Sequence, residues 1–404
     1  MEKLGSSKED ILIDNFINRY TLKGVFNKSE FEELLAKSII SENRELRRVS
    51  CKIVRRLRLQ NFLSYIRVLL NDEDFVIKSL ALLAVAQFRD HKSVEKIVEL
   101  YNDENKLVKA SVVLALGSID EPKTYNLIFE SLNDKNEEVR ENAIVALSWI
   151  NYQQAYKKLI QLYETENNKN LKNRIIKAFS ILPRELVLEK LKEIVLKEND
   201  NILILSAINS LYKKGISAYN ILADTIILKA INDVLKNEKE DLLRKNLYTI
   251  SSHTLWEIKN INEENQAKIY KFIEEDLFLK YYMKSEELKR LAISSLKNLS
   301  SKYHQWIIKI FEYELSGSLK IDIINFLSNP RVDKNFKILL LEFIKDEDKF
   351  IKEQALFALL DGNYPKSILS FINQKIYSME YSYLKLIILA ILYNEFNSGN
   401  NQKF

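Results

Sequence analysis

The chain of 404 residues has few of the residues that tight turns and covalent cross-links require, with 7 glycines, 4 prolines and 1 cysteine. No GxGxxG, GxxxxGK or GxSxG motif occurs, which excludes the familiar phosphate-binding loops and the nucleophile elbow. A single cysteine excludes a disulfide framework and a CxxC-type zinc site. The sequence lacks an apolar signal segment and a run long enough to span a membrane, so we expect a cytoplasmic protein.

The residues that are abundant favour helices. Hydrophobic residues make up 47% of the chain and charged residues 29%, and leucine, isoleucine, lysine, glutamate and asparagine dominate. The net charge of +5 is placed unevenly. Residues 1–70 contain 14 Lys/Arg and 9 Asp/Glu, whereas the remaining residues contain 61 − 14 = 47 and 56 − 9 = 47. The excess of positive charge therefore lies in the first sixth of the chain.

A repeat with a period of 31 or 32 residues organises the sequence. The segment 71–74 (NDED) recurs as 102–105 (NDEN) and 133–136 (NDKN). An aliphatic anchor follows each segment, and the anchors are Leu46, Ile77, Val108, Val139, Leu171, Leu203, Leu288, Leu319 and Ile351. The longer interval from Leu203 to Leu288 leaves room for two or more stretched units, for which Leu242 is the expected anchor.

The residues around each anchor predict a helix. Positions +5 and +8 from the anchor are apolar, and position +7 is mostly alanine or serine, as at Ala84, Ala115 and Ala146. This spacing forms one stripe of an α-helix, and the small residue allows a neighbouring helix to approach closely. A second amphipathic segment lies between successive anchors. We therefore predict an all-α protein, an α-solenoid (right-handed superhelix) of about ten antiparallel helix pairs, in which each pair needs its neighbours for burial.

The runs 102–117 and 133–147 resemble the HEAT repeat, most closely the short subtype described in phycobilisome lyases, and 346–359 is similar. The resemblance implies that the anchored helices line the concave face. It also implies a ladder of acidic and basic residues within and between repeats. The ladder residues are Asp72 with Lys78, Asp103 with Lys109, Asp134 with Arg140, and Asp346 with Lys352.

Five segments are expected along the chain. Residues 1–39 form an N-terminal helical cap, residues 40–215 regular HEAT-like repeats, and residues 216–284 irregular helical repeats. Residues 285–376 return to HEAT-like repeats, and residues 377–404 form a C-terminal capping helix with a polar tail.

Two groups of residues are candidates for binding a partner. Positions +2 and +6 vary between repeats, so we expect them to be exposed. At position +6 three repeats carry apolar residues, and a tryptophan follows, which would suit a bound helix or peptide. These residues are Leu83, Leu114, Val145 and Trp149. If the helical phase is shifted by one position, they belong to the core instead.

The first repeat carries a dense group of positive charges. These residues are Arg44, Arg47, Arg48, Lys52, Arg55, Arg56 and Arg58. One interpretation is a solvated terminal cap of the solenoid. The other is a docking site for an acidic protein or a nucleic-acid backbone.

No catalytic constellation is evident. His91, His253 and His304 are far apart in sequence, so we expect surface or helix-end positions, and Cys51 falls in an apolar column. We predict a non-catalytic scaffold without metal or cofactor that binds a protein or peptide on its concave face. The alternatives are nucleic-acid binding through the basic repeat and an enzyme resembling HEAT-fold DNA glycosylases or bilin lyases. A glycosylase would need aromatic residues such as Trp149, Trp256 and Trp306 to hold a base.

Overall fold

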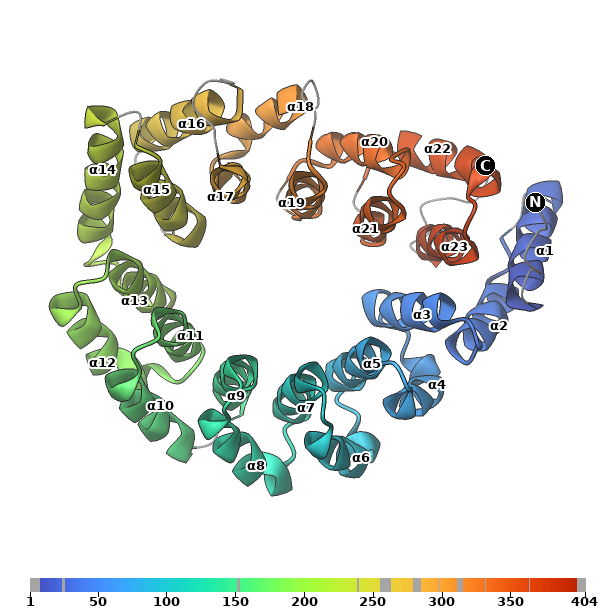
Figure 1. Ribbon diagram of the computed structural model, residues 1–404, viewed down its shortest axis with the longest axis horizontal. Helices are drawn as coiled ribbons and strands as arrows, with labels where there is room; N and C mark the ends of the chain where they lie inside the picture. Colours follow the sequence, from blue (N-terminus) through green and yellow to red (C-terminus); the bar gives the residue numbers. More distant parts are fainter. Residues whose placement is uncertain are drawn as a thin grey trace. The chain divides into compact units, whose positions relative to one another are not determined.

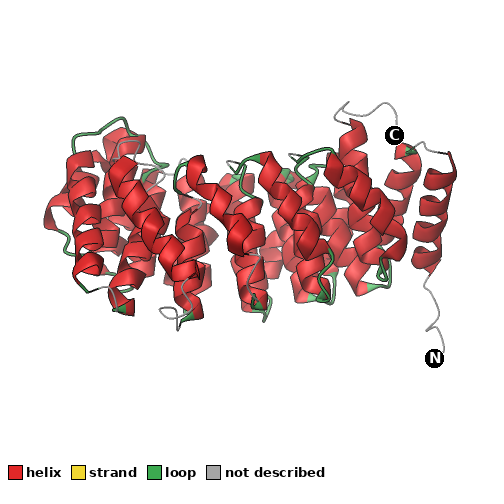
Figure 2. Cartoon of the chain, turned by 90° about the horizontal axis from the view of Figure 1, so that it is seen from above, coloured by secondary structure: helices red, strands yellow, loops and turns green. Residues whose placement is uncertain are grey.

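The computed structural model describes most of the chain. The described residues are 8–23, 26–150, 153–237, 240–254, 263–278, 285–296, 298–310, 315–330, 332–362 and 364–397. All regular elements in these ranges are helices (Figure 2). The prediction of an all-α solenoid is therefore confirmed.

The helices alternate between two layers, as the ribbon of each part of the chain shows (Figure 1). In each part of the chain, the helices with anchors predicted from the sequence lie in one of the two layers: α3 (Arg44–Arg56), α5 (Phe75–Gln87), α7 (Lys106–Ile119), α9 (Glu137–Trp149), α11 (Lys169–Phe179), α13 (Asn201–Lys213), α15 (Asp241–Thr254), α17 (Glu286–Leu296), α19 (Gly317–Leu327) and α21 (Lys349–Leu359). The predicted C-terminal capping helix is α23 (Ser382–Asn397). The helices that follow α3 to α21 form the other: α4 (Leu63–Val68), α6 (Val94–Glu99), α8 (Tyr125–Glu130), α10 (Gln153–Thr165), α12 (Arg184–Lys197), α14 (Asn220–Lys236), α16 (Glu263–Phe278), α18 (Ile307–Ile310), α20 (Leu340–Ile344) and α22 (Ser367–Lys375). Within the described residues, α3 to α22 thus make ten pairs.

Several helices of the second layer are short and continue into 3₁₀ turns. These turns are η1 (Gln60–Phe62), η2 (Leu69–Asn71), η3 (His91–Ser93), η4 (Leu100–Asn102), η5 (Pro122–Thr124), η6 (Ser131–Asn133), η7 (Ser301–Trp306), η8 (Lys334–Leu339) and η9 (Ile376–Ser378). Two further helices, α1 (Lys8–Lys23) and α2 (Lys28–Ile39), precede the first pair.

The recurring polar segment before each anchor explains where the helices begin. Three residues before the anchor, a side-chain oxygen accepts hydrogen bonds from the first free backbone N–H groups of the helix. Asp74 does this for Val76 and Ile77 at the start of α5, and Asn105 does it for Leu107 at the start of α7. The period visible in the sequence is therefore a period of helix caps.

The apolar columns form the core, and the small residues set the distance between helices. Leu82 and Val85 of α5 are fully buried, as are their counterparts in the following helices. A Cβ atom added at Gly117 of α7 would lie 2.4 Å from the Cβ of Ala146 on α9. The alanine at position +7 thus packs directly on the backbone of the preceding anchored helix.

The contacts divide the chain into two compact units. Unit 1 contains residues 1–150 together with 340–404, and unit 2 contains residues 151–339. In unit 1 the two ends of the chain pack together, because α23 contacts α21 of its own segment and also α1, α2 and α3. The ring of Tyr393 on α23 lies 4.9 Å from that of Phe31 on α2, and Tyr393 Oη donates a 2.5 Å hydrogen bond to Glu32 Oε1.

The stretched region of unit 2 required a correction. Leu242 was the expected anchor, but its side chain is 68% exposed at the start of α15. Leu247 and Tyr248 are fully buried, and Ser295 Oγ of α17 donates to the Tyr248 carbonyl. Counted from Leu243, which is half-buried, buried residues lie at +4, +5, +7 and +8, so the anchor lies one residue later than expected.

Candidate partner-binding surface

The apolar row lies on three successive helices of unit 1. Leu83 of α5, Leu114 of α7 and Val145 of α9 are half-buried, whereas their neighbours at +5 and +7 are buried. Trp149, at the end of α9, is 45% exposed. The row therefore borders the core and reaches solvent. Helices α5, α7 and α9, which carry the row, lie on the inner side of the arc formed by α3 to α9 (Figure 1).

Position +2 differs from expectation. Ser79 of α5 and Ala110 of α7 are buried, although this position was expected to be exposed. The close approach of α5, α7 and α9 covers these small side chains. Asn142 Nδ2 on α9 donates a 2.9 Å hydrogen bond to the Ala110 carbonyl, which satisfies a polar group at this contact. The surface available to a partner is thus narrower than the sequence indicated and centres on position +6.

Ion pairs between successive repeats hold these helices in register. Lys78 Nζ lies 2.6 Å from Asp103 Oδ2, and Lys109 Nζ lies 2.6 Å from Asp134 Oδ2. The other oxygen of each aspartate accepts the backbone N–H of the residue two positions on, so one carboxylate joins the loop and the preceding helix. Burial acts to raise the pKa of Asp103 and Asp134, but the lysine and the backbone N–H outweigh it, and both pKa values lie below the usual 3.8.

The remaining ladder residues lie in other contacts. Asp72 accepts from Arg47 of the preceding repeat at 2.7 Å. Arg140 Nη1 donates to the carbonyl of Asp134 at 2.8 Å. Asp346 Oδ1 accepts the N–H of Asp348 at 2.9 Å, and no ion pair among the described residues involves Lys352. Each lysine or arginine that forms a ladder ion pair reaches the aspartate of the following repeat.

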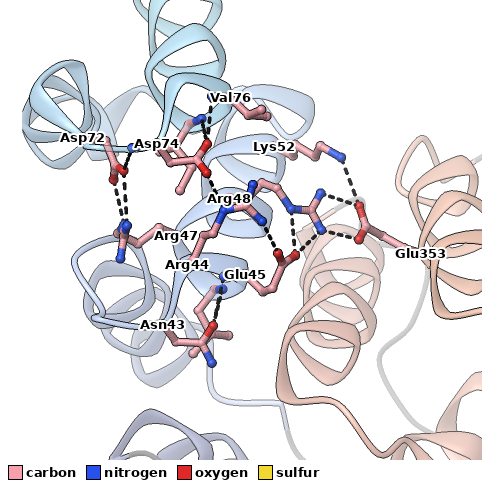
Figure 3. Close-up of polar contacts among 12 residues, drawn as sticks. Asn43, Arg44, Glu45, Arg47, Arg48, Lys52, Asp72, Asp74, Val76 and Glu353 are labelled. Carbon is pink, nitrogen blue, oxygen red and sulfur yellow. Dashed lines mark hydrogen bonds and ion pairs between the residues drawn. The ribbon is translucent and has the colours of Figure 1, made fainter.

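The basic residues of α3 are largely used inside the protein (Figure 3). Arg44 pairs with Asp74 and Glu45, and Arg47 pairs with Asp72 of the next repeat. These contacts neutralise the first part of the cluster and connect α3 to the loop before α5.

The second part of the cluster connects the two ends of the chain. Arg48 Nη1 lies 2.8 Å from Glu353 Oε1 of α21, and Lys52 Nζ lies 3.0 Å from the same oxygen. Arg56 Nη2 lies 2.5 Å from Asp361 Oδ2, just beyond α21. These partners could not be predicted from the repeat, because Glu353 is 305 residues away from Arg48.

Glu353 is a buried charge with two cationic partners. Its side chain is 2% exposed. Desolvation acts to raise its pKa, but the hydrogen bond from Arg48 and the charges of Lys52 and Arg48 outweigh this effect, so the pKa of Glu353 is lower than the usual 4.5. The carboxylate is therefore ionised at neutral pH and fixes both cations.

Arg55 and Arg58 complete the predicted cluster. Arg55 is half-buried, Arg58 is exposed, and neither takes part in an ion pair within the described residues. Binding of a nucleic-acid backbone through the cluster stays a prediction. Such binding would have these two arginines available at once, whereas Arg48 and Lys52 would first have to leave Glu353.

The residues considered for catalysis are scattered. Cys51 is fully buried, and burial raises the pKa of its thiol to about 12, so it stays protonated. His91 is exposed, with Nδ1 3.0 Å from Glu121 Oε2. His304 is buried rather than at the surface, because η7 turns it against the ring of Phe326. The structure does not describe the side chain of His253.

The aromatic residues for a base pocket are also separated in sequence. Of the three tryptophans, the structure describes the side chain of Trp149; Trp256 and the side chain of Trp306 lie outside the described residues. A search of the described part of the chain found no group of three or more His, Cys, Asp or Glu that could hold a metal ion. In the same residues, no helix is long and apolar enough to cross a membrane.

Comparisons with known proteins agree with the repeat. The family model for HEAT repeats matches residues 94–180, which span α6 to α11. No curated protein matches the chain. The phycobilisome-lyase subtype stays a prediction.

Similar solved structures include an engineered protein, with 14% identity over 91% of this chain and 98% of that chain and a TM-score of 0.33. A homology model of the full-length AP-3 complex has 14% identity over 97% and 87%, with a TM-score of 0.41. A structure concerning the interaction between cadherin and beta-catenin has 11% identity over 96% and 98%, with a TM-score of 0.31. Likenesses this distant carry no inference about a partner. The family match shows HEAT repeats in residues 94–180.

Proposed function

We propose that this protein is a non-catalytic scaffold, and that a helix or extended peptide of a partner protein binds across α5, α7 and α9. The observation that carries the proposal is the apolar row of Leu83, Leu114 and Val145, which ends at Trp149. Three equivalent positions on parallel helices are apolar and half-buried, although positions of a repeat helix that reach solvent are usually polar.

The geometry favours a peptide over a small molecule. Neighbouring packed helices lie about 8–10 Å apart, so three successive side chains of the row cover roughly 20 Å. An amphipathic helix presents apolar residues at comparable intervals through its i, i+3, i+4 and i+7 positions. The exposed indole of Trp149 would supply the large contact that often dominates such interfaces.

A site-specific cross-linking experiment tests the proposal. A photoreactive phenylalanine analogue would replace Leu114 in one variant and Leu196, an exposed leucine of α12 in unit 2, in the control. We expect the Leu114 variant to cross-link one discrete protein in host lysate after nuclease treatment, and the Leu83→Asp substitution to abolish that product. Equal labelling from both positions, or a product insensitive to Leu83→Asp, would refute the proposed surface.

The dependence of binding affinity on salt concentration distinguishes this proposal from nucleic-acid binding. Binding through an apolar row should change little between low and high salt, because little charge is neutralised. Binding to a phosphate backbone should weaken steeply over the same range. Recovery of a partner that disappears with nuclease or with salt would direct attention to Arg55 and Arg58 instead.

A further inference from the structure

Helix α14 of unit 2 has two apolar faces. One face is buried against α13, α15 and α16, and its residues are Ala223, Ile226, Ile227, Ala230, Ile231 and Val234. The other face points to solvent and contains Ile221, Leu228 and Leu235 at steps of seven residues. These three side chains are 79%, 38% and 47% exposed. We call them the α14 stripe.

The neighbouring helix of the same layer shows what such a face normally contains. The exposed positions of α12 include Glu185 and Glu189, and Glu189 forms a 2.9 Å ion pair with Lys192. The exposed leucine of α12, Leu196, has no apolar residue seven positions before it, because Glu189 stands there. A single exposed leucine is ordinary on a protein surface, whereas three aligned along one face are not.

The length of the stripe suits contact with another helix. Ile221 and Leu235 are 14 residues apart, which corresponds to about 21 Å along a helix. Apolar residues that recur every seven positions stay on one side of the helix for its whole length. The α14 stripe therefore presents a straight apolar seam rather than a compact patch.

The exposed charges of α14 are both positive, whereas its two aspartates, Asp224 and Asp233, are half-buried. Lys229 and Lys236 are exposed and also seven residues apart, and neither takes part in an ion pair within the described residues. If two copies of α14 paired antiparallel around a two-fold axis, the flank of one helix that carries the lysines would face the same flank of the other helix. The lysines of the two copies would then repel each other. A helix with acidic residues on its flank would gain attraction where a second copy meets repulsion.

We propose that the α14 stripe binds an amphipathic helix of a partner protein that carries glutamate or aspartate beside its apolar seam. This second surface lies in unit 2 and is independent of the row on α5, α7 and α9. Aliphatic contacts would supply most of the affinity, and the lysines would select partners by charge and speed their association.

The test uses two synthetic peptides of three heptads, labelled with fluorescein. Both have leucine at positions a and d; one has glutamate at e and g, and the other has lysine there. We expect the full chain to bind the glutamate peptide at least about tenfold more tightly in a fluorescence anisotropy titration. The Leu228→Asp substitution should weaken this binding at least about tenfold, as loss of a central contact does.

Two variants serve as controls. Leu196→Asp places the same charge on an exposed leucine of the neighbouring helix, so it should bind like the unmodified chain. The double substitution Lys229→Glu/Lys236→Glu changes two exposed residues outside the core. It should reverse the preference in favour of the lysine peptide.

Three outcomes would overturn the proposal. The first is equal binding of the two peptides, and the second is binding that persists in the Leu228→Asp variant. The third is a dimer of the unmodified chain in sedimentation velocity that the Leu228→Asp substitution dissociates, because the occupant would then be a second copy.

Discussion

Removing the Glu353 carboxylate should loosen the contact between the two ends of the chain. In a Glu353→Ala variant, Arg48 would lose its buried partner and keep the more exposed Glu45, which lies 2.7 Å from it, while Lys52 would lose its ion-pair partner. Breaking a buried ion pair by removing one partner typically costs about 3–5 kcal/mol, because the remaining charge stays desolvated. We expect a cost at the lower end of this range, about 3 kcal/mol, because Glu45 still pairs with Arg48. The ion pair of Arg56 with Asp361 joins the same segments, but both side chains are exposed, so Asp361→Ala should cost about 1 kcal/mol or less.

Hydrogen exchange measured by mass spectrometry reports this difference locally. The amides of α3 and α23 should exchange roughly 10² times faster in Glu353→Ala, since each 1.4 kcal/mol corresponds to a factor of ten. Exchange in Asp361→Ala should rise by less than about tenfold. An equal effect of the two substitutions, or protection of α3 that survives Glu353→Ala, would refute the reasoning. A double variant with methionine at Arg48 and Glu353 should recover most of the protection, because the uncompensated charge is gone.

Three further predictions concern stability. Gly117→Ala should lower the urea midpoint by an amount equivalent to about 1–3 kcal/mol, because the new methyl group overlaps Ala146, and Gly117→Ala/Ala146→Gly should recover part of this loss. Asn105→Ala should cost about 1 kcal/mol in the same titration, since the cap on the Leu107 N–H is lost. The pKa of Glu353 is lower in the folded protein than in the unfolded chain. The stability that this difference contributes is complete above the unfolded pKa of about 4.3 and is lost as the pH falls through the folded value. The free energy of unfolding of a Glu353→Gln variant should therefore depend less on pH below about 4.3, as measured by acid unfolding.

Much of the fold could be predicted from the sequence because HEAT-type contacts are local. The anchors, the small residues at +7 and the polar caps recur with the same period, and each acts on its own helix or on the next one. Leu242 was misplaced by one residue because the interval from Leu203 to Leu288 does not keep that period. The ladder was expected within and between repeats. Lys78 and Lys109 pair with the aspartate of the following repeat, because their side chains extend toward the loop that precedes the next anchored helix.

The candidate site could likewise be predicted only where its residues follow the repeat. The apolar residues at +6 could be placed because their neighbours at +5 and +7 fix the helical phase. The partners of Arg48 and Arg56 could not be identified, because a repeat of 31 residues specifies contacts between adjacent units and says nothing about Glu353, 305 residues from Arg48. A dense basic segment therefore looked like an open binding site although most of its charges are neutralised within unit 1.

A sequence signal for the contact between the ends is nevertheless present in α23. A helix that closes a solenoid needs a polar outer face, but residues 386–393 contain no charge, and Leu386 to Leu392 are all buried. A helix that is apolar on all sides must be covered on all sides. Helix α21 covers one side of α23, and α1, α2 and α3 cover others. The positive charges of α3 and the apolar residues of α23 therefore both form the contact between the two ends of the chain within unit 1. On the surface from α3 to α9, the apolar row is the part that we propose a partner binds.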